Sequence, residues 1–203
     1  MRRLTKLVIV ALTVSLYFTF AGTASAGRFG LSEDHFTVVW NDLDFAAGTI
    51  ACSVTFEGSF HSRTIVKSVG SLIGFITEAE VGPCDAGEAR VLKIDLPWHV
   101  WYQSFAGRLP LITSIRVAIL DVSVLSIQPA RCLYRSTPRA AAFATIHRNT
   151  GTGVATSIRA DETAGLVLFD NSLEDDWFWT CPEVAGFSGT SVSLTPAITV
   201  TLI

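Results

Sequence analysis

The sequence predicts an all-β protein built as a single antiparallel β-sandwich or barrel and stapled by two disulfides. Apolar and polar residues alternate along most of the chain, the pattern of strands with one buried face. Clusters rich in Gly, such as 149–153 and 186–189, separate these runs and indicate turns. Four cysteines follow an N-terminal secretion signal, which favours disulfides. Helical periodicity is hard to find in the same stretches.

The first 26 residues have the layout of a secretory signal peptide. Arg2, Arg3 and Lys6 precede an apolar run over 7–20, and small residues ending in Ala24-Ser25-Ala26 follow. Cleavage after Ala26 would leave residues 27–203 as a single secreted domain. The alternative is an uncleaved membrane anchor, but the apolar run is shorter than the about 20 residues that span a bilayer. We therefore expect an extracellular protein without a membrane span after cleavage.

Net charge and the fraction of apolar residues exclude some classes of partner and of structure. Three of the 15 Lys and Arg lie in the signal and none of the 18 Asp and Glu do, so 12 bases face 18 acids and the net charge becomes −6. Without a basic stripe, nucleic acid is not an expected partner. Apolar residues make up 49% of the chain and charged residues 16%, which excludes global disorder.

The cysteines Cys52, Cys84, Cys132 and Cys181 permit three disulfide connectivities. We favour Cys52–Cys84 and Cys132–Cys181, because each pair then joins neighbouring strands or loops. Loops of 32 and 49 residues would contribute about 3–4 kcal/mol each in the chain-entropy model. A zinc site is the alternative, but the C-x-x-C and C-x-x-H spacings are missing from the sequence.

The strands are expected in the following order along the chain. They lie at 36–40, 50–57, 72–77, 90–94, 96–105, 112–127, 142–147, 154–160, 165–169 and 197–203.

The strand at 96–105 carries the candidate ligand site. Its alternation places Trp98, Val100 and Tyr102 on one face, and His99, Trp101, Gln103 and Phe105 on the other. Trp101 offers a flat apolar surface for a sugar ring or a small apolar ligand, and His99 and Gln103 flank it with hydrogen-bonding groups. In the structural alternative these aromatics fill the core, as a second pair, Trp177 and Trp179, would do beside Cys181.

Metal binding and catalysis have weaker support. The acidic run 170–176 is rich in oxygen ligands, but a calcium loop would need Gly at position 175 and Glu at 181, where the chain has Asp and Cys. Asp42 and Asp44 share a strand face, as the paired carboxylates of a glycosidase would, yet this spacing is common. The G-x-S-x-G elbow of many hydrolases is missing from the sequence. We therefore assign no catalytic residue, metal or cofactor, and keep a secreted hydrolase as an alternative.

Three short motifs carry a resemblance. These are G-T-I-x-C at 48–52, G-S-F-H-S at 58–62 and L-P-W-H-V at 96–100. In them the middle half of the chain resembles small secreted actinobacterial proteins of unknown function. The resemblance implies secretion and an all-β fold, and it transfers no catalytic residue. The leading functional hypothesis is a non-catalytic secreted binding protein for a glycan, a small apolar ligand or a cell-surface protein, and the alternative is a structural or adhesive domain.

Overall fold

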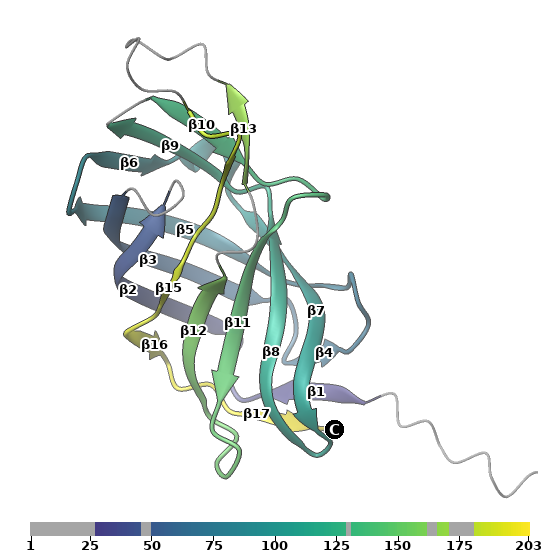
Figure 1. Ribbon diagram of the computed structural model, residues 1–203. Helices are drawn as coiled ribbons and strands as arrows, with labels where there is room; N and C mark the ends of the chain where they lie inside the picture. The colour runs from purple at the N-terminus through teal and green to yellow at the C-terminus, as the bar shows by residue number, and fades with distance from the viewer. Residues whose placement is uncertain (1–26, 46–49, 129–130, 162–165, 171–180) are drawn as a thin grey trace, which may run out of the picture.

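The computed structural model describes residues 27–45, 50–128, 131–161, 166–170 and 181–203, which form three antiparallel sheets (Figure 1). The all-β prediction is confirmed. The largest sheet has nine strands, in the spatial order β15 (Gly189–Thr190), β12 (Ala155–Asp161), β11 (Ala142–Arg148), β8 (Leu111–Leu120), β7 (Trp98–Arg108), β5 (Leu72–Cys84), β3 (Ile50–Phe60), β2 (His35–Phe45) and β16 (Ser193–Thr195).

Apolar residues at alternate positions along the strands explain why one face of this sheet is buried. In β3, Ile50, Cys52, Val54 and Phe56 are buried, whereas the residues between them are half-buried. Such a strand lowers its free energy by turning its apolar face towards other apolar faces, at about 25 cal/mol for each Å² removed from water.

The large sheet closes on itself through residues 188–195, which we call the closing segment. On one side, Gly189 and Thr190 pair with β12. On the other side, Ser193–Thr195 pair with β2, and Ser188 exchanges two backbone hydrogen bonds of 2.8 and 3.2 Å with Asp44. The protein is therefore a barrel rather than a simple sandwich. If the closing segment is counted once, the ring has eight positions, a size at which the interior holds either packed side chains or one small ligand.

Two smaller sheets cover the ends of the barrel (Figure 1). At one end lies a three-stranded sheet of β17 (Val200–Leu202), β1 (Arg28–Leu31) and β4 (Thr64–Val66). At the opposite end lies a five-stranded sheet of β14 (Val184–Ala185), β13 (Leu166–Asp170), β10 (Cys132–Arg135), β9 (Ser123–Gln128) and β6 (Glu88–Val91).

Both disulfides pair as the sequence predicts. Cys52–Cys84 joins directly opposite residues of β3 and β5, with Cα atoms 3.9 Å apart. Cys132–Cys181 ties β10 to the chain just before β14, with a Cα separation of 5.7 Å. Each bridge thus holds together parts of the fold that neighbour each other in space.

Several predicted strand boundaries are wrong. The run 112–127 is broken at Asp121, whose φ of 65° lies in the left-handed region, so that β8 stays in the barrel while β9 joins the five-stranded sheet. The strand at 72–77 continues to Cys84, and the run 90–94 is a short strand followed by a 3₁₀ turn at Lys93–Asp95. The turn expected at 186–189 contributes instead to the closing segment. None of the described residues belongs to a helix long and apolar enough to cross a membrane.

Candidate functional site: an apolar cavity inside the barrel

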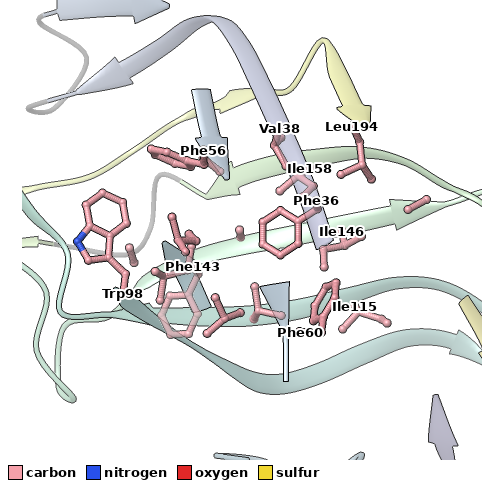
Figure 2. A pocket seen from close by; sticks show the side chains of 18 of the residues that line it. Phe36, Val38, Phe56, Phe60, Trp98, Ile115, Phe143, Ile146, Ile158 and Leu194 are labelled. Carbon is pink, nitrogen blue, oxygen red and sulfur yellow. The ribbon is translucent and has the colours of Figure 1, made fainter. Parts of the chain in front are cut away.

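The barrel encloses a cavity of about 80 Å³ (Figure 2). Its lining comes from strands all around the ring and from the three-stranded sheet. Every lining residue is aliphatic or aromatic, and none carries a charge. An apolar ligand inside the cavity would therefore be removed from water, whereas an ion would find no charged side chain to replace its hydration.

One wall of the cavity is aromatic. Phe36 and Trp40 of β2 face Phe56 and Phe60 of β3, and Trp98 of β7 completes the group. The rings form a connected set, because the centroids of Phe36 and Phe60 and those of Trp40 and Phe56 are 5.2 Å apart, and those of Phe56 and Trp98 are 5.5 Å apart. Tilted and edge-on contacts of this kind stabilise a rigid aromatic surface.

Apart from Phe143, the strands β11 and β12 contribute only small and aliphatic residues to the lining, and this explains the space. Ala144 of β11 lies directly opposite Val117 of β8 on one side and Ala160 of β12 on the other. All three line the cavity, as do Ile146 and Ile158. Alanine fills little of the volume between the walls, so the aromatic side chains meet a gap rather than a close-packed partner. The alanines at alternate positions 142 and 144 were the available sequence signal for this gap, and the sequence interpretation missed it.

The ends of the cavity are covered by the flanking elements. Leu31, Ile65 and Val200 line it from β1, β4 and β17, the strands of the three-stranded sheet. Towards the five-stranded sheet, Val122 lines it from the connection between β8 and β9. Because both ends are covered, a molecule inside would be largely withdrawn from water.

Two indole nitrogens beside this cavity are unusual. Trp40 and Trp98 are 3% and 1% exposed, and the Nε1 atom of each is buried with no hydrogen-bond partner in the part of the chain that the structure describes. A buried donor without an acceptor costs about 1–3 kcal/mol. Buried polar groups are otherwise almost always paired, so these two N–H groups need an explanation.

The predicted ligand residues His99, Trp101 and Gln103 lie elsewhere. They follow Trp98 on β7, but they alternate with the buried residues Val100 and Tyr102 and so face away from the cavity. The predicted sharing of faces is correct as far as Gln103. A β-bulge then leaves Gln103 unpaired, and Phe105 turns inward, where its ring meets that of Phe29 at 6.0 Å.

His99 has a defined partner on this outer face. Its Nδ1 atom lies 2.5 Å from Oδ2 of Asp121, and its ring meets the edge of Phe75 at a centroid distance of 5.3 Å. An acid on Nδ1 orients an imidazole as in a catalytic triad, but such chemistry also needs a nucleophile on the other nitrogen. Among the described residues, no hydroxyl or thiol makes a hydrogen bond with His99. Asp42 and Asp44 are held in β2, where Ser188 donates a hydrogen bond of 3.0 Å to Asp44.

Two groups outside the cavity have shifted pKa values. A hydrogen bond with His35, whose Nδ1 lies 3.0 Å from Oδ1 of Asp34, lowers the pKa of that carboxyl below its ordinary value. Burial raises the pKa of the Tyr102 hydroxyl above its ordinary value. Neither group lines the cavity.

The remaining candidates from the sequence fall outside the described residues or do not form a site. The signal peptide, the acidic run after Asp170, and Trp177 and Trp179 fall outside the described residues. Among the residues that are described, no three His, Cys, Asp or Glu side chains come together as a metal site would require.

No known protein family, curated protein or solved structure matches the chain. The resemblance to small secreted actinobacterial proteins therefore stays a prediction, and the function is argued from the cavity alone.

Proposed function

We propose that this protein is a secreted binding protein that takes up a small apolar molecule inside its barrel. The observation that carries the proposal is a cavity of about 80 Å³ whose lining is wholly aliphatic and aromatic. The two disulfides suit the extracellular location that the signal peptide predicts.

The free-energy cost of an unfilled cavity supports a role for it in ligand binding. A cavity costs about 24 cal/mol per Å³, so 80 Å³ left without a ligand costs about 2 kcal/mol. That is a sizeable share of the about 5–15 kcal/mol by which a typical domain is stable. Replacing Ala144 or Ala160 by a larger apolar residue would reduce the cost, and a ligand that fills the space offsets it in the same way.

The size of the cavity limits the ligand. An apolar cavity of about 150 Å³ accepts benzene or xenon and stays free of water. The present cavity has about half that volume, so we expect a compact ligand of at most one small ring, with modest adjustment of the surrounding side chains. A charged head group has no counterion in the lining and would stay in water.

The test is direct uptake of small apolar probes by the secreted chain. Xenon should give a distinct ¹²⁹Xe NMR signal for bound gas, and benzene should raise the melting temperature in proportion to the logarithm of its concentration above the dissociation constant. Ala160→Ile, which adds three carbons to the wall, should abolish both effects while leaving the far-UV circular dichroism unchanged. Absence of uptake by the unaltered protein would refute the proposal and favour a structural or adhesive domain.

A further inference from the structure

Aliphatic side chains are exposed at the end of the barrel that the three-stranded sheet covers. We call this group the apolar rim, and its members are Val66, Val69, Leu109, Leu111 and Ile203. We propose that the apolar rim and the bases beside it dock the protein on a lipid bilayer with anionic head groups. The inference goes beyond the proposed function and does not depend on it, because docking needs no ligand in the cavity.

The turn between β7 and β8 carries the first part of the apolar rim. Leu109 and Leu111 stand on either side of Pro110 and are 52% and 59% exposed. Arg108, also exposed, lies directly opposite Leu111. Single exposed leucines are common on soluble proteins, but two at one turn with a neighbouring base suit the boundary between head groups and acyl chains.

The outer face of the three-stranded sheet carries the second part. Arg28 of β1 lies opposite Val66 of β4, and it exchanges two backbone hydrogen bonds of 3.0 Å with Ile203. Directly opposite residues of an antiparallel pair point to the same face, so these three exposed side chains form a row. Phe29, the next residue of β1, is completely buried, so the row faces away from the cavity. Val69 lies in the turn after β4 and is 71% exposed.

Contacts between β1 and β7 bring the two parts to one end of the molecule. The ring centroids of Phe29 and Phe105 are 6.0 Å apart. Lys67 Nζ lies 5.0 Å from the centroid of Phe29 and 5.8 Å from that of Phe105. Phe105 comes shortly before the turn that carries the two leucines. Figure 1 accordingly shows β1, β17 and the β7–β8 turn at the same end of the barrel.

The charge of this end favours an anionic surface. The segments that form it contain three bases, Arg28, Lys67 and Arg108, and no Asp or Glu, although the secreted chain as a whole is acidic. These segments are 27–31, 64–70, 105–114 and 196–203. A basic side chain close to an anionic bilayer strengthens binding about fivefold.

Acids beyond β1 do not cancel this charge. Glu33 and Asp34 each place a carboxylate oxygen 3.8 Å from a side-chain nitrogen of Arg63, so the three groups together carry a single negative charge. Arg28 and Arg108 form no ion pair with any described residue. Their guanidinium groups are therefore available to the phosphate oxygens of lipid head groups.

Docking at this end would suit the uptake of apolar molecules. Leu31, Ile65 and Val200 line the cavity from the inner face of the three-stranded sheet, whose outer face carries part of the apolar rim. A docked molecule would hold the covered end of its cavity against the bilayer, where small apolar molecules concentrate.

The test is sedimentation of the secreted chain with vesicles. Vesicles of equal parts phosphatidylglycerol and phosphatidylcholine are compared with vesicles of phosphatidylcholine alone. We expect binding to the mixed vesicles that is weaker on phosphatidylcholine and weakens as NaCl is added. Leu109→Ser with Leu111→Ser should lower the partition coefficient at least about tenfold, because both side chains lose their burial in the interface. Arg108→Glu should lower it at least about fivefold on the mixed vesicles and leave it unchanged on phosphatidylcholine.

Matched controls come from exposed residues outside the apolar rim. Ile94→Ser with Val192→Ser removes two exposed aliphatic side chains, from the 3₁₀ turn and from the closing segment. Arg139→Glu reverses an exposed charge in the turn after β10. Both controls should bind mixed vesicles like the unaltered chain, and equal melting temperatures would show that every variant is folded.

Three results would overturn the inference. The first is no binding of the unaltered chain to mixed vesicles, and the second is an equal loss of binding in the rim variants and their controls. The third is self-association that Leu109→Ser with Leu111→Ser abolishes, without vesicle binding, which would assign the apolar rim to a second copy of the chain. Xenon and benzene uptake is measured without vesicles, so each of these results leaves the proposed function standing.

Discussion

Replacing Ala144 by valine tests whether the gap in the barrel is real and whether it is the ligand site. Ala144 is 6% exposed and lies between Val117 and Ala160 on the inner face, so two added methyl groups would enter the cavity. At about 0.8 kcal/mol for each buried carbon, the upper limit of the gain is about 1.6 kcal/mol. Minor adjustment of neighbours should leave about 1 kcal/mol, which corresponds to a rise of about 2–4 °C in melting temperature for a chain of this length.

The assay combines calorimetry with benzene titration of the same samples. We expect the melting temperature of Ala144→Val to rise while the affinity for benzene falls at least tenfold, because the substituted side chain occupies the space that the probe needs. Thr145→Val places the same side chain on the outer face of the same strand and should change neither quantity appreciably.

Two outcomes would refute the reasoning in different ways. A melting temperature lowered by several degrees would mean that the walls are already in close contact, so that valine overpacks the core. A raised melting temperature with unchanged benzene affinity would mean that the gap exists but that benzene binds elsewhere.

Three further perturbations follow from the structure. Cys132→Ser with Cys181→Ser opens a loop of 49 residues and should lower the free energy of unfolding by about 4 kcal/mol, measured by urea denaturation against the unaltered protein. Tyr102 has a pKa raised by burial, so its contribution to stability is fully present below the ordinary value of 10.0 and is lost as the pH rises above it. Tyr102→Phe should therefore flatten the fall in melting temperature above pH 10.0. Trp101→Ala removes an outer-face side chain and should leave xenon uptake unchanged, whereas loss of uptake would return the site to the outer face of β7.

The fold class and the disulfides follow from the sequence because they depend on local patterns. Alternation in residues such as Ile50–Phe56 is a property of the strand itself, and the spacing of Cys52 and Cys84 suits neighbouring strands whichever way the sheet bends. The faces of β7 were predicted correctly for the same reason. The prediction fails at Phe105, after the bulge at Gln103, because a bulge is decided by the pairing partner and cannot be recognised from the local sequence.

Closure of the barrel and the cavity depend on contacts between distant parts of the chain. The segment 188–195 is rich in Ser, Gly and Thr, so its sequence predicts a strand only weakly. Pairing with β12 on one side and with β2 on the other holds it in an extended conformation. Asp121 ends β8 without help from glycine or proline. A gap between two walls arises only when the alanines of β11 and β12 face the rings of β2, β3 and β7, and a single sequence does not display which positions face each other across a barrel.

Closure by the closing segment has a consequence for how this chain reaches its native state. Until residues 188–195 arrive, β2 and β12 are two unpaired sheet edges, open to pairing with other chains. The contact between Asp44 and Ser188 spans 144 positions, a large loop whose ends rarely meet by diffusion. The Cys132–Cys181 bridge anchors the chain only a few residues before the closing segment, so an early disulfide would shorten this search. Oxidation of this cysteine pair would then protect the chain against aggregation as well as stabilise its final fold.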